Sequence, residues 1–196
     1  MNRIEIIQTF IDKLSAKNYL EIGVQAGHCF RAIRCENKTG VDPDPSSAAT
    51  HKVTSDDFFK QNETCKGKWD IIFIDGLHHA EQVYIDIQNS LACLSKGGVI
   101  IMHDCLPTNK HMQEIPLTNQ NEWTGDTWKA FVKLRQERED LYMAVVDTDW
   151  GCGLIMEGQQ NKLTTDLETN YENFANNKQE WMNIISVNKF RQMAML

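Results

Sequence analysis

Apolar residues recur at helical spacing at the start of the chain. Between Arg3 and Leu14 the apolar positions are Ile4, Ile6, Ile7, Phe10, Ile11 and Leu14. This spacing places the apolar side chains on one face of a helix. The pattern predicts an amphipathic helix that covers one face of a sheet.

Later apolar segments are short and have the length of β-strands. They are residues 19–23, a strand ending at Val41, a weak strand at 52–54, and the segments 69–74, 99–102, 141–146 and 152–156. The runs 69–74 and 99–102 are almost continuously apolar, which is typical of parallel strands buried on both faces. Helical patterns at 27–35, 56–60, 80–94 and 127–138 alternate with the strands. Ser55 is placed to cap the second of these helices.

This alternation predicts a Rossmann-like, doubly wound α/β fold. We expect a mostly parallel, seven-stranded sheet with an antiparallel last strand, because only residues 147–151 connect the strands 141–146 and 152–156. Residues 1–157 are expected to form one domain. Residues 158–196, with a helix across 167–185, are expected to form a C-terminal helical extension packed on it. The polar loop 106–122 has the length of a lid.

Charge and composition exclude several classes of protein. The chain has 196 residues, and its 27 acidic and 20 basic residues give a net charge of −7, which disfavours nucleic acid as a partner. Charges interrupt the apolar residues of the amino terminus, and no later apolar run is long enough to cross a membrane. We therefore expect a cytoplasmic protein that does not bind membranes. The six cysteines contain no C-x-x-C pair, so we expect buried or free thiols.

The candidate site residues follow the predicted strands. They are Glu21 and Gly23, Gly27, Asp42, Ser55 and Asp56, Asp75 and His78, and His103 and Asp104. The carboxyl ends of parallel strands meet at one edge of a sheet, where ligands bind in open α/β folds. The turn from Gly23 to Gly27 lacks the G-x-G-x-x-G pattern of nicotinamide oxidoreductases, and its E-x-G-x-x-x-G spacing fits S-adenosylmethionine better. Asp42 can accept the two ribose hydroxyls of an adenosine cofactor.

Two stretches of the chain resemble a known family. Residues 69–86 read Trp-Asp-Ile-Ile-Phe-Ile-Asp-Gly-Leu-His-His-Ala-Glu-Gln-Val-Tyr-Ile-Asp, and residues 97–104 read Gly-Gly-Val-Ile-Ile-Met-His-Asp. This pattern resembles class I S-adenosylmethionine-dependent methyltransferases. It is most similar to the metal-dependent sugar and macrolide O-methyltransferases, which are distantly related to catechol O-methyltransferase. The resemblance covers roughly residues 18–157.

The resemblance implies roles for the candidate residues. Glu21, Gly23 and Gly27 would form the turn that binds the methionine part of the cofactor, together with Asp75. Asp42 would hold the ribose, and Ser55 and Asp56 would flank the adenine. Asp75 and Asp104 match positions that bind a divalent metal, with His103 at a position that is commonly acidic. The two carboxylates suit magnesium, which prefers oxygen ligands, whereas the imidazole of His103 suits manganese better. We therefore expect a magnesium or a manganese ion.

Methyl transfer to a hydroxyl requires that the hydroxyl lose its proton. Either a bound metal lowers the pKa of the hydroxyl, or a base such as His78, beside Asp75, accepts the proton. We expect the acceptor to be a small molecule or a glycan. The sequence is compatible with both a monomer and a homo-oligomer. The alternatives are a metal-independent methyltransferase acting on oxygen or nitrogen, and a non-catalytic module that binds S-adenosylmethionine.

Trp123 and Trp150 could line a substrate pocket, whereas the helical spacing of Trp128 favours the core.

Overall fold

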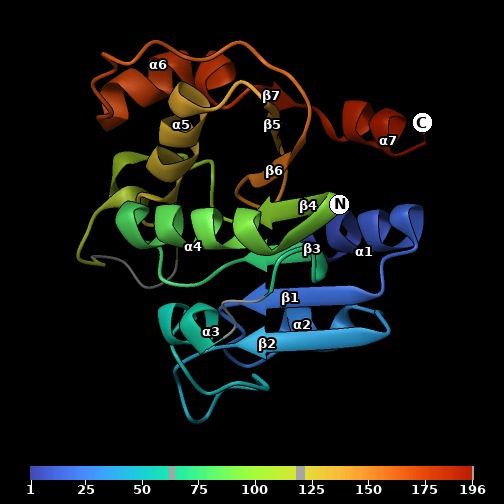
Figure 1. Cartoon of the computed structure of the whole chain (residues 1–196). Helices are drawn as coiled ribbons and strands as arrows, with labels where there is room; N and C mark the ends of the chain where they lie inside the picture. The colour runs from blue at the N-terminus through green and yellow to red at the C-terminus, as the bar shows by residue number, and fades with distance from the viewer. Residues whose placement is uncertain (62–64, 118–121, 196) are drawn as a thin grey trace.

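A seven-stranded sheet forms the centre of the molecule (Figure 1). The computed structural model describes residues 1–61, 65–117 and 122–195. The strands are β1 (Asn18–Ile22), β2 (Asn37–Val41), β3 (Trp69–Ile74), β4 (Leu94–Met102), β5 (Leu141–Val146), β6 (Cys152–Glu157) and β7 (Ile184–Ile185). Their order is β2-β1-β3-β4-β6-β5-β7, and β6 pairs antiparallel with both of its neighbours, whereas the other pairs are parallel. The predicted α/β fold is confirmed.

Helices cover both faces of the sheet. They are α1 (Arg3–Leu14), α2 (His28–Ala32), α3 (Ser55–Gln61), α4 (Ala80–Cys93), the 3-10 helix η1 (Lys110–Gln113), α5 (Thr127–Glu137), α6 (Tyr171–Trp181) and α7 (Val187–Met195). Side chains from α1, α2 and α7 join one apolar core, and those from α3, α4, α5 and α6 join the other. The alternation of buried residues along β1 divides them between the two cores, since Tyr19 enters one and Leu20 the other.

One predicted strand is wrong. Residues 52–54 do not form a strand, and only His51 pairs with β2, through an isolated bridge to Val41. The chain then turns into α3, because the hydroxyl of Thr54 accepts a hydrogen bond from the backbone N–H of Asp57. Thr54 therefore caps this helix, and Ser55 is its first residue. Two further differences are small: α4 ends at Cys93, and Gly97 and Gly98 lie within β4.

The seventh strand comes from the C-terminal segment. β7 pairs parallel with β5, so that Ile184 lies opposite Val145 and Ile185 opposite Val146. The following helix, α7, packs on α1, where the rings of Phe10 and Phe190 meet at 5.7 Å. The expected helix across 167–185 is shorter, because α6 ends at Trp181. Residues 184–195 thus complete both the sheet and one core.

The cysteines differ from the expectation of free thiols. Cys65 and Cys93 form a disulfide that joins the segment before β3 to the end of α4. Cys29, Cys35, Cys105 and Cys152 are free, and the last two are buried. The sequence does not reveal the pair because the two residues are separated by 28 positions and only the fold brings their Cα atoms to 5.0 Å.

The predicted lid loop has several anchors in the part that the structure describes. Met112 is buried, and the indole N–H of Trp123 donates to the carbonyl of Glu114. Residues 118–121 of this loop lie outside the described residues. Within the described ranges, no helix combines the length and the apolar character needed to cross a bilayer.

Candidate functional site

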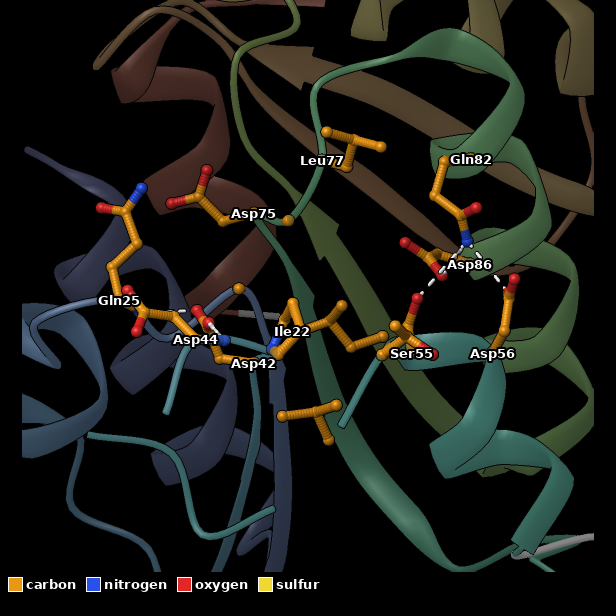
Figure 2. A pocket seen from close by; sticks show the side chains of 15 residues that line it. Ile22, Gln25, Asp42, Asp44, Ser55, Asp56, Asp75, Leu77, Gln82 and Asp86 are labelled. Atoms are coloured by element: carbon orange, nitrogen blue, oxygen red, sulfur yellow. Dashed lines mark hydrogen bonds between the residues drawn. The ribbon is translucent and has the colours of Figure 1, made fainter. Parts of the chain in front are cut away.

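A cavity of about 490 Å³ lies at the carboxyl ends of β1, β2 and β3. Figure 2 shows Asp42 and Asp44 on one side of this cavity and Ser55, Asp56 and Asp86 on the other. The topology explains this arrangement, because β1 is the point at which the chain changes direction across the sheet, with β2 on one side and β3 on the other. We name this space the first cavity.

Asp42 holds the loop that borders the first cavity. Its carboxylate accepts hydrogen bonds from the backbone N–H groups of Gln25, at 2.7 Å, and Asp44, at 2.9 Å. A carboxylate has about four acceptor positions, so two backbone bonds leave capacity for the two hydroxyls of a ribose. Asp42 is thus both a structural residue and a potential ligand group.

The opposite wall contains a hydrogen-bonded set of polar side chains. The side-chain amide of Gln82 donates to Asp56 at 3.0 Å and to Asp86 at 3.2 Å, and lies 3.4 Å from the hydroxyl of Ser55. Asp86 is almost fully buried, and burial raises its pKa to about 6. Gln82 and Asp86 were not among the candidate site residues predicted from the sequence. An acidic residue on the apolar face of the predicted helix 80–94 was the available signal.

A second cavity, of about 370 Å³, adjoins the first. Both cavities are bordered by Gly23, Gln25 and Asp75, so one elongated ligand can occupy both. Glu21 and the turn from Gly23 to Gly27 line the second cavity, as do Arg3 and Asp149.

The glycines of this turn allow a close approach of two strands. Gly23 has a φ of +88°, and a Cβ atom there would lie 2.0 Å from the carbonyl oxygen of Asp75. Any side chain at this position would push the end of β1 away from the end of β3. Gly27 has a φ of +78° and precedes α2. The expected glycine turn is therefore where the sequence placed it.

Glu21 is buried at the base of the second cavity. The phenolic O–H of Tyr19 donates to its carboxylate at 2.5 Å. Burial raises the pKa of Glu21 to about 7, against the opposing effect of this hydrogen bond. Glu21 can therefore gain or lose a proton near neutral pH when a charged ligand enters.

Four ionisable side chains meet beside Asp75. His78 lies between two carboxylates, with Nε2 3.4 Å from Asp75 and Nδ1 3.3 Å from Asp104. His103 Nδ1 lies 3.1 Å from Asp104 and 3.4 Å from Asp75. The structure thus brings together Asp75, His78, His103 and Asp104, as the strand ends predicted; we name them the acid–histidine cluster.

The charges in this cluster depend on one another. Burial disfavours a proton on His103, but the carboxylates of Asp104, Asp149 and Asp75 outweigh it and raise its pKa to about 11. The pKa of His78 is raised for the same reason, against its burial. Burial would raise the pKa of Asp75, yet the two imidazoles hold it well below its usual range.

Two residues that the sequence analysis did not single out complete the cluster. Arg3 Nη1 lies 3.0 Å from Asp75, and Arg3 Nε lies 3.0 Å from Asp149. Asp149 Oδ1 is also 3.6 Å from His103 Nε2. Arg3 and Asp149 are 146 positions apart in the chain, so neither residue had a sequence signal that linked it to the site.

The described residues offer two groups of potential metal ligands. One group contains Asp75, His78 and Asp104, and the other contains His103, Asp149 and Cys152. Two of the three expected ligands, Asp75 and Asp104, therefore lie together, with His78 as their partner. Nδ1 of His103 has the Arg3 guanidinium at 3.2 Å, which disfavours a second cation at that atom.

Two tryptophan side chains lie next to the histidines of the cluster. The ring of Trp123 stacks on His78 at 5.1 Å, and Trp150, which is 42% exposed, lies 6.4 Å from the ring of His103. Trp128 is fully buried and packs on Phe174, in agreement with its predicted core position. Two of the three tryptophans thus lie beside the histidines of the cluster.

Comparison with known families agrees with this geometry. Residues 20–105 match the family model of a methyltransferase domain, and they include the ends of β1, β2, β3 and β4. Over these residues the chain is therefore similar to methyltransferases. A comparison of the chain with curated proteins found no match.

Several solved structures share the fold of this protein. An O-methyltransferase from Bacillus cereus in complex with S-adenosylhomocysteine is 18% identical, with a TM-score of 0.59 over 81% of this chain and 80% of that chain. A methyltransferase from Podospora anserina bound to the same molecule is 17% identical, with a TM-score of 0.57 over 79% and 77%. The O-methyltransferase TomG from Streptomyces achromogenes, in complex with S-adenosylmethionine, is 15% identical, with a TM-score of 0.57 over 78% of each chain.

Proposed function

We propose that this methyltransferase transfers the methyl group of S-adenosylmethionine to a hydroxyl of a small molecule or a glycan. The observation that carries the proposal is the position of Asp75. It borders both cavities and also belongs to the acid–histidine cluster. The cofactor and the group that accepts a hydroxyl proton would therefore meet at one residue. The O-methyltransferases among the solved structures support an oxygen acceptor.

The two cavities fit the two ends of the cofactor. In the first cavity, Asp42 would accept the ribose hydroxyls, and Ser55 and Asp56 would flank the adenine, whose amino group can donate to a carboxylate. In the second cavity, the turn from Gly23 to Gly27 gives the methionine part access to the backbone. The Glu21 carboxylate would accept hydrogen bonds from the methionine ammonium group there.

His78 is the best-placed base for the acceptor hydroxyl. Its side chain is 18% exposed, whereas that of His103 is 1% exposed, so an acceptor can reach His78 more readily. The carboxylates of Asp75 and Asp104 would stabilise the imidazolium formed when His78 takes the proton. Because they raise the pKa of His78, the imidazole loses its proton at a higher pH than a free imidazole does. The unprotonated base is therefore populated only above that pH, and activity should rise with pH over this range.

The cluster also fits a divalent cation. Asp104 Oδ1 and His78 Nδ1 are buried and make no hydrogen bond among the described residues, although His78 Nδ1 lies 3.3 Å from the other oxygen of Asp104. Asp75, His78 and Asp104 would hold the cation, and this mixed oxygen and nitrogen set favours manganese over magnesium. A bound cation supplies Lewis-acid chemistry that lowers the pKa of a coordinated hydroxyl. His78 would then be a ligand and could not serve as the base.

The first experiment follows methyl transfer by the purified protein. Panels of phenolic, sugar and aliphatic hydroxyl acceptors, with amines for comparison, are incubated with S-adenosylmethionine, and mass spectrometry locates the methyl group. We expect O-methyl products. Methylation of amines alone would favour the nitrogen-acceptor alternative. Cofactor binding without transfer to any acceptor would favour the non-catalytic module.

A pair of histidine variants tests the base. His78→Gln should lose about a hundredfold in turnover, with unchanged affinity for S-adenosylhomocysteine by calorimetry. His79→Gln is the control, because His79 is adjacent in sequence but is absent from the ion pairs of the cluster in the described part of the chain. Turnover that survives a chelator supports His78 as the base, whereas loss that manganese restores supports the metal arrangement. Full activity in His78→Gln would refute both roles.

A further inference from the structure

Arg3 is the only arginine or lysine among the described residues that line the second cavity. Three carboxylates, of Glu21, Asp75 and Asp149, line the same space. The ammonium group of a ligand can bind to several of these carboxylates. A ligand carboxylate has one permanently charged partner among the described lining residues, the guanidinium of Arg3. The methionine part of S-adenosylmethionine carries both groups.

The guanidinium of Arg3 keeps a free donor. Its Nε donates to one oxygen of Asp149 and its Nη2 to the other, at 3.0 and 3.2 Å. Its Nη1 donates to Asp75 at 3.0 Å and approaches His103. Since a guanidinium has five N–H groups, Nη2 retains one N–H without a partner among the described residues. The side chain is 27% exposed, so a ligand can reach it.

The turn between β5 and β6 fixes the orientation of Arg3. Asp149 and Trp150 have φ angles of +50° and +56°, a conformation that residues other than glycine rarely adopt. Besides its two side-chain bonds, Asp149 accepts the backbone N–H of Arg3 at 2.8 Å. The hydroxyl of Thr148 donates to the carbonyl of Met1. This turn therefore binds both the backbone and the side chain at the start of α1.

We propose that Arg3 binds the carboxylate of the cofactor's methionine part, and that Asp149 is the positioning residue that aims it. The two cavities share Gly23 and Asp75, so a cofactor with its adenosine in the first cavity extends its amino-acid end toward Arg3. A charge-assisted hydrogen bond from Arg3 then selects ligands with an intact carboxylate. The inference rests on the cofactor and is independent of the acceptor.

Calorimetry with two ligands tests this role. S-adenosylhomocysteine has the carboxylate, and 5′-methylthioadenosine has the same nucleoside and sulfur but no amino-acid part. Arg3→Gln should weaken binding of S-adenosylhomocysteine about tenfold or more, and leave binding of 5′-methylthioadenosine unchanged. Asp149→Asn should show the same selectivity with a smaller loss. Arg34→Gln, at an exposed arginine outside both cavities, should change neither affinity.

A third ligand separates the carboxylate from the ammonium group. Decarboxylated S-adenosylmethionine keeps the ammonium group, and its affinity should be equal for the wild-type protein and Arg3→Gln. Equal losses for all ligands would show that Arg3 only maintains the shape of the site, and unchanged binding of S-adenosylhomocysteine would also overturn the proposal. If the wild-type protein bound none of the ligands, the cofactor assignment itself would fail.

Discussion

The buried carboxylates of the two cavities differ in what balances their charge. Asp75 and Asp149 face Arg3 and the imidazoles, which hold the pKa of each carboxyl below its usual range despite burial. At Asp86 and Glu21 burial outweighs the opposing hydrogen bonds and raises the pKa of each carboxyl, to about 6 and about 7. The protein thus keeps fixed charges in the acid–histidine cluster, whereas Glu21 and Asp86 in the walls of the two cavities have raised pKa values.

The raised pKa of Asp86 predicts a pH-dependent change in stability. The folded pKa is about 6, whereas that of an unfolded aspartate is about 3.9. The folded protein therefore favours the protonated form, and this contribution to stability is complete below the unfolded pKa and is lost as the pH rises through 6. Relative to the wild type, Asp86→Asn should gain on the order of 2 kcal/mol in free energy of unfolding between about pH 4 and about pH 8.

Urea denaturation at several pH values measures this effect. Asp57→Asn is the control, because Asp57 lies on the neighbouring helix α3 and is exposed. The difference in free energy of unfolding between Asp57→Asn and the wild type should stay constant over the same pH range. A constant difference for Asp86→Asn would mean that Asp86 does not change its protonation in this range.

At the scale of elements, the site depends on how closely the ends of β1 and β3 approach. Gly23 directly follows β1 and Asp75 directly follows β3, and their backbones are in contact. A similar contact holds the start of α4, because a Cβ atom at Gly125 would lie 1.8 Å from the carbonyl of His78. The carboxylate of Asp126 also accepts the backbone N–H of Ala80. The loop before α5 therefore fixes the turn that carries His78.

Two glycine variants separate close approach from backbone conformation. Gly23 and Gly97 both have a positive φ, but a Cβ atom at Gly97 would have nothing within 4 Å. Gly97→Ala should therefore cost only about 1 kcal/mol of stability, from the unfavourable φ. Gly23→Ala should cost about 3 kcal/mol or more, because the backbones must also separate.

Thermal unfolding and calorimetry check this prediction. Gly23→Ala should also lose affinity for S-adenosylhomocysteine, whereas Gly97→Ala should keep it, since Gly97 lies outside both cavities. Equal costs for the two variants would show that the approach of β1 to β3 is less tight than the structure indicates.

At the scale of the whole molecule, the two ends of the chain stabilise one face of the sheet. α1 and α7 pack on each other there, and β7 lies at the edge next to β5 (Figure 1). Arg3 lies at the start of α1. The packing of the C-terminal helix against α1 therefore supports a helix that also contributes to the site.

Phe190 tests the contribution of this packing. It is 1% exposed and meets Phe10 edge to face, so Phe190→Ala should cost about 3 kcal/mol in free energy of unfolding. Leu14→Ala is the control on the same face, because Leu14 is 39% exposed and should change stability by less than about 0.5 kcal/mol. Urea denaturation of the two variants measures both values. A loss below about 1 kcal/mol for Phe190→Ala would mean that α7 adds little to the core.

The local pattern of the sequence determined most of the sheet and the residues at its edge. Apolar runs identified β1, β3, β4, β5 and β6, because burial on both faces of a sheet requires such runs whatever the rest of the chain does. Strands of one parallel sheet end at the same edge. The sequence therefore predicted that one edge of the sheet holds Asp42, Asp75, His78 and Asp104.

Only the tertiary structure decided the contacts between distant and weakly patterned segments. β7 has two residues, too few for a periodic signal, and it forms only because β5 offers a free edge. The pair Cys65–Cys93 depends on where α4 ends relative to the segment before β3. Arg3 resembles any charged residue at the start of an amphipathic helix. Its place in the site follows from the turn that carries Asp149, and long-range packing of this kind leaves no trace in local periodicity.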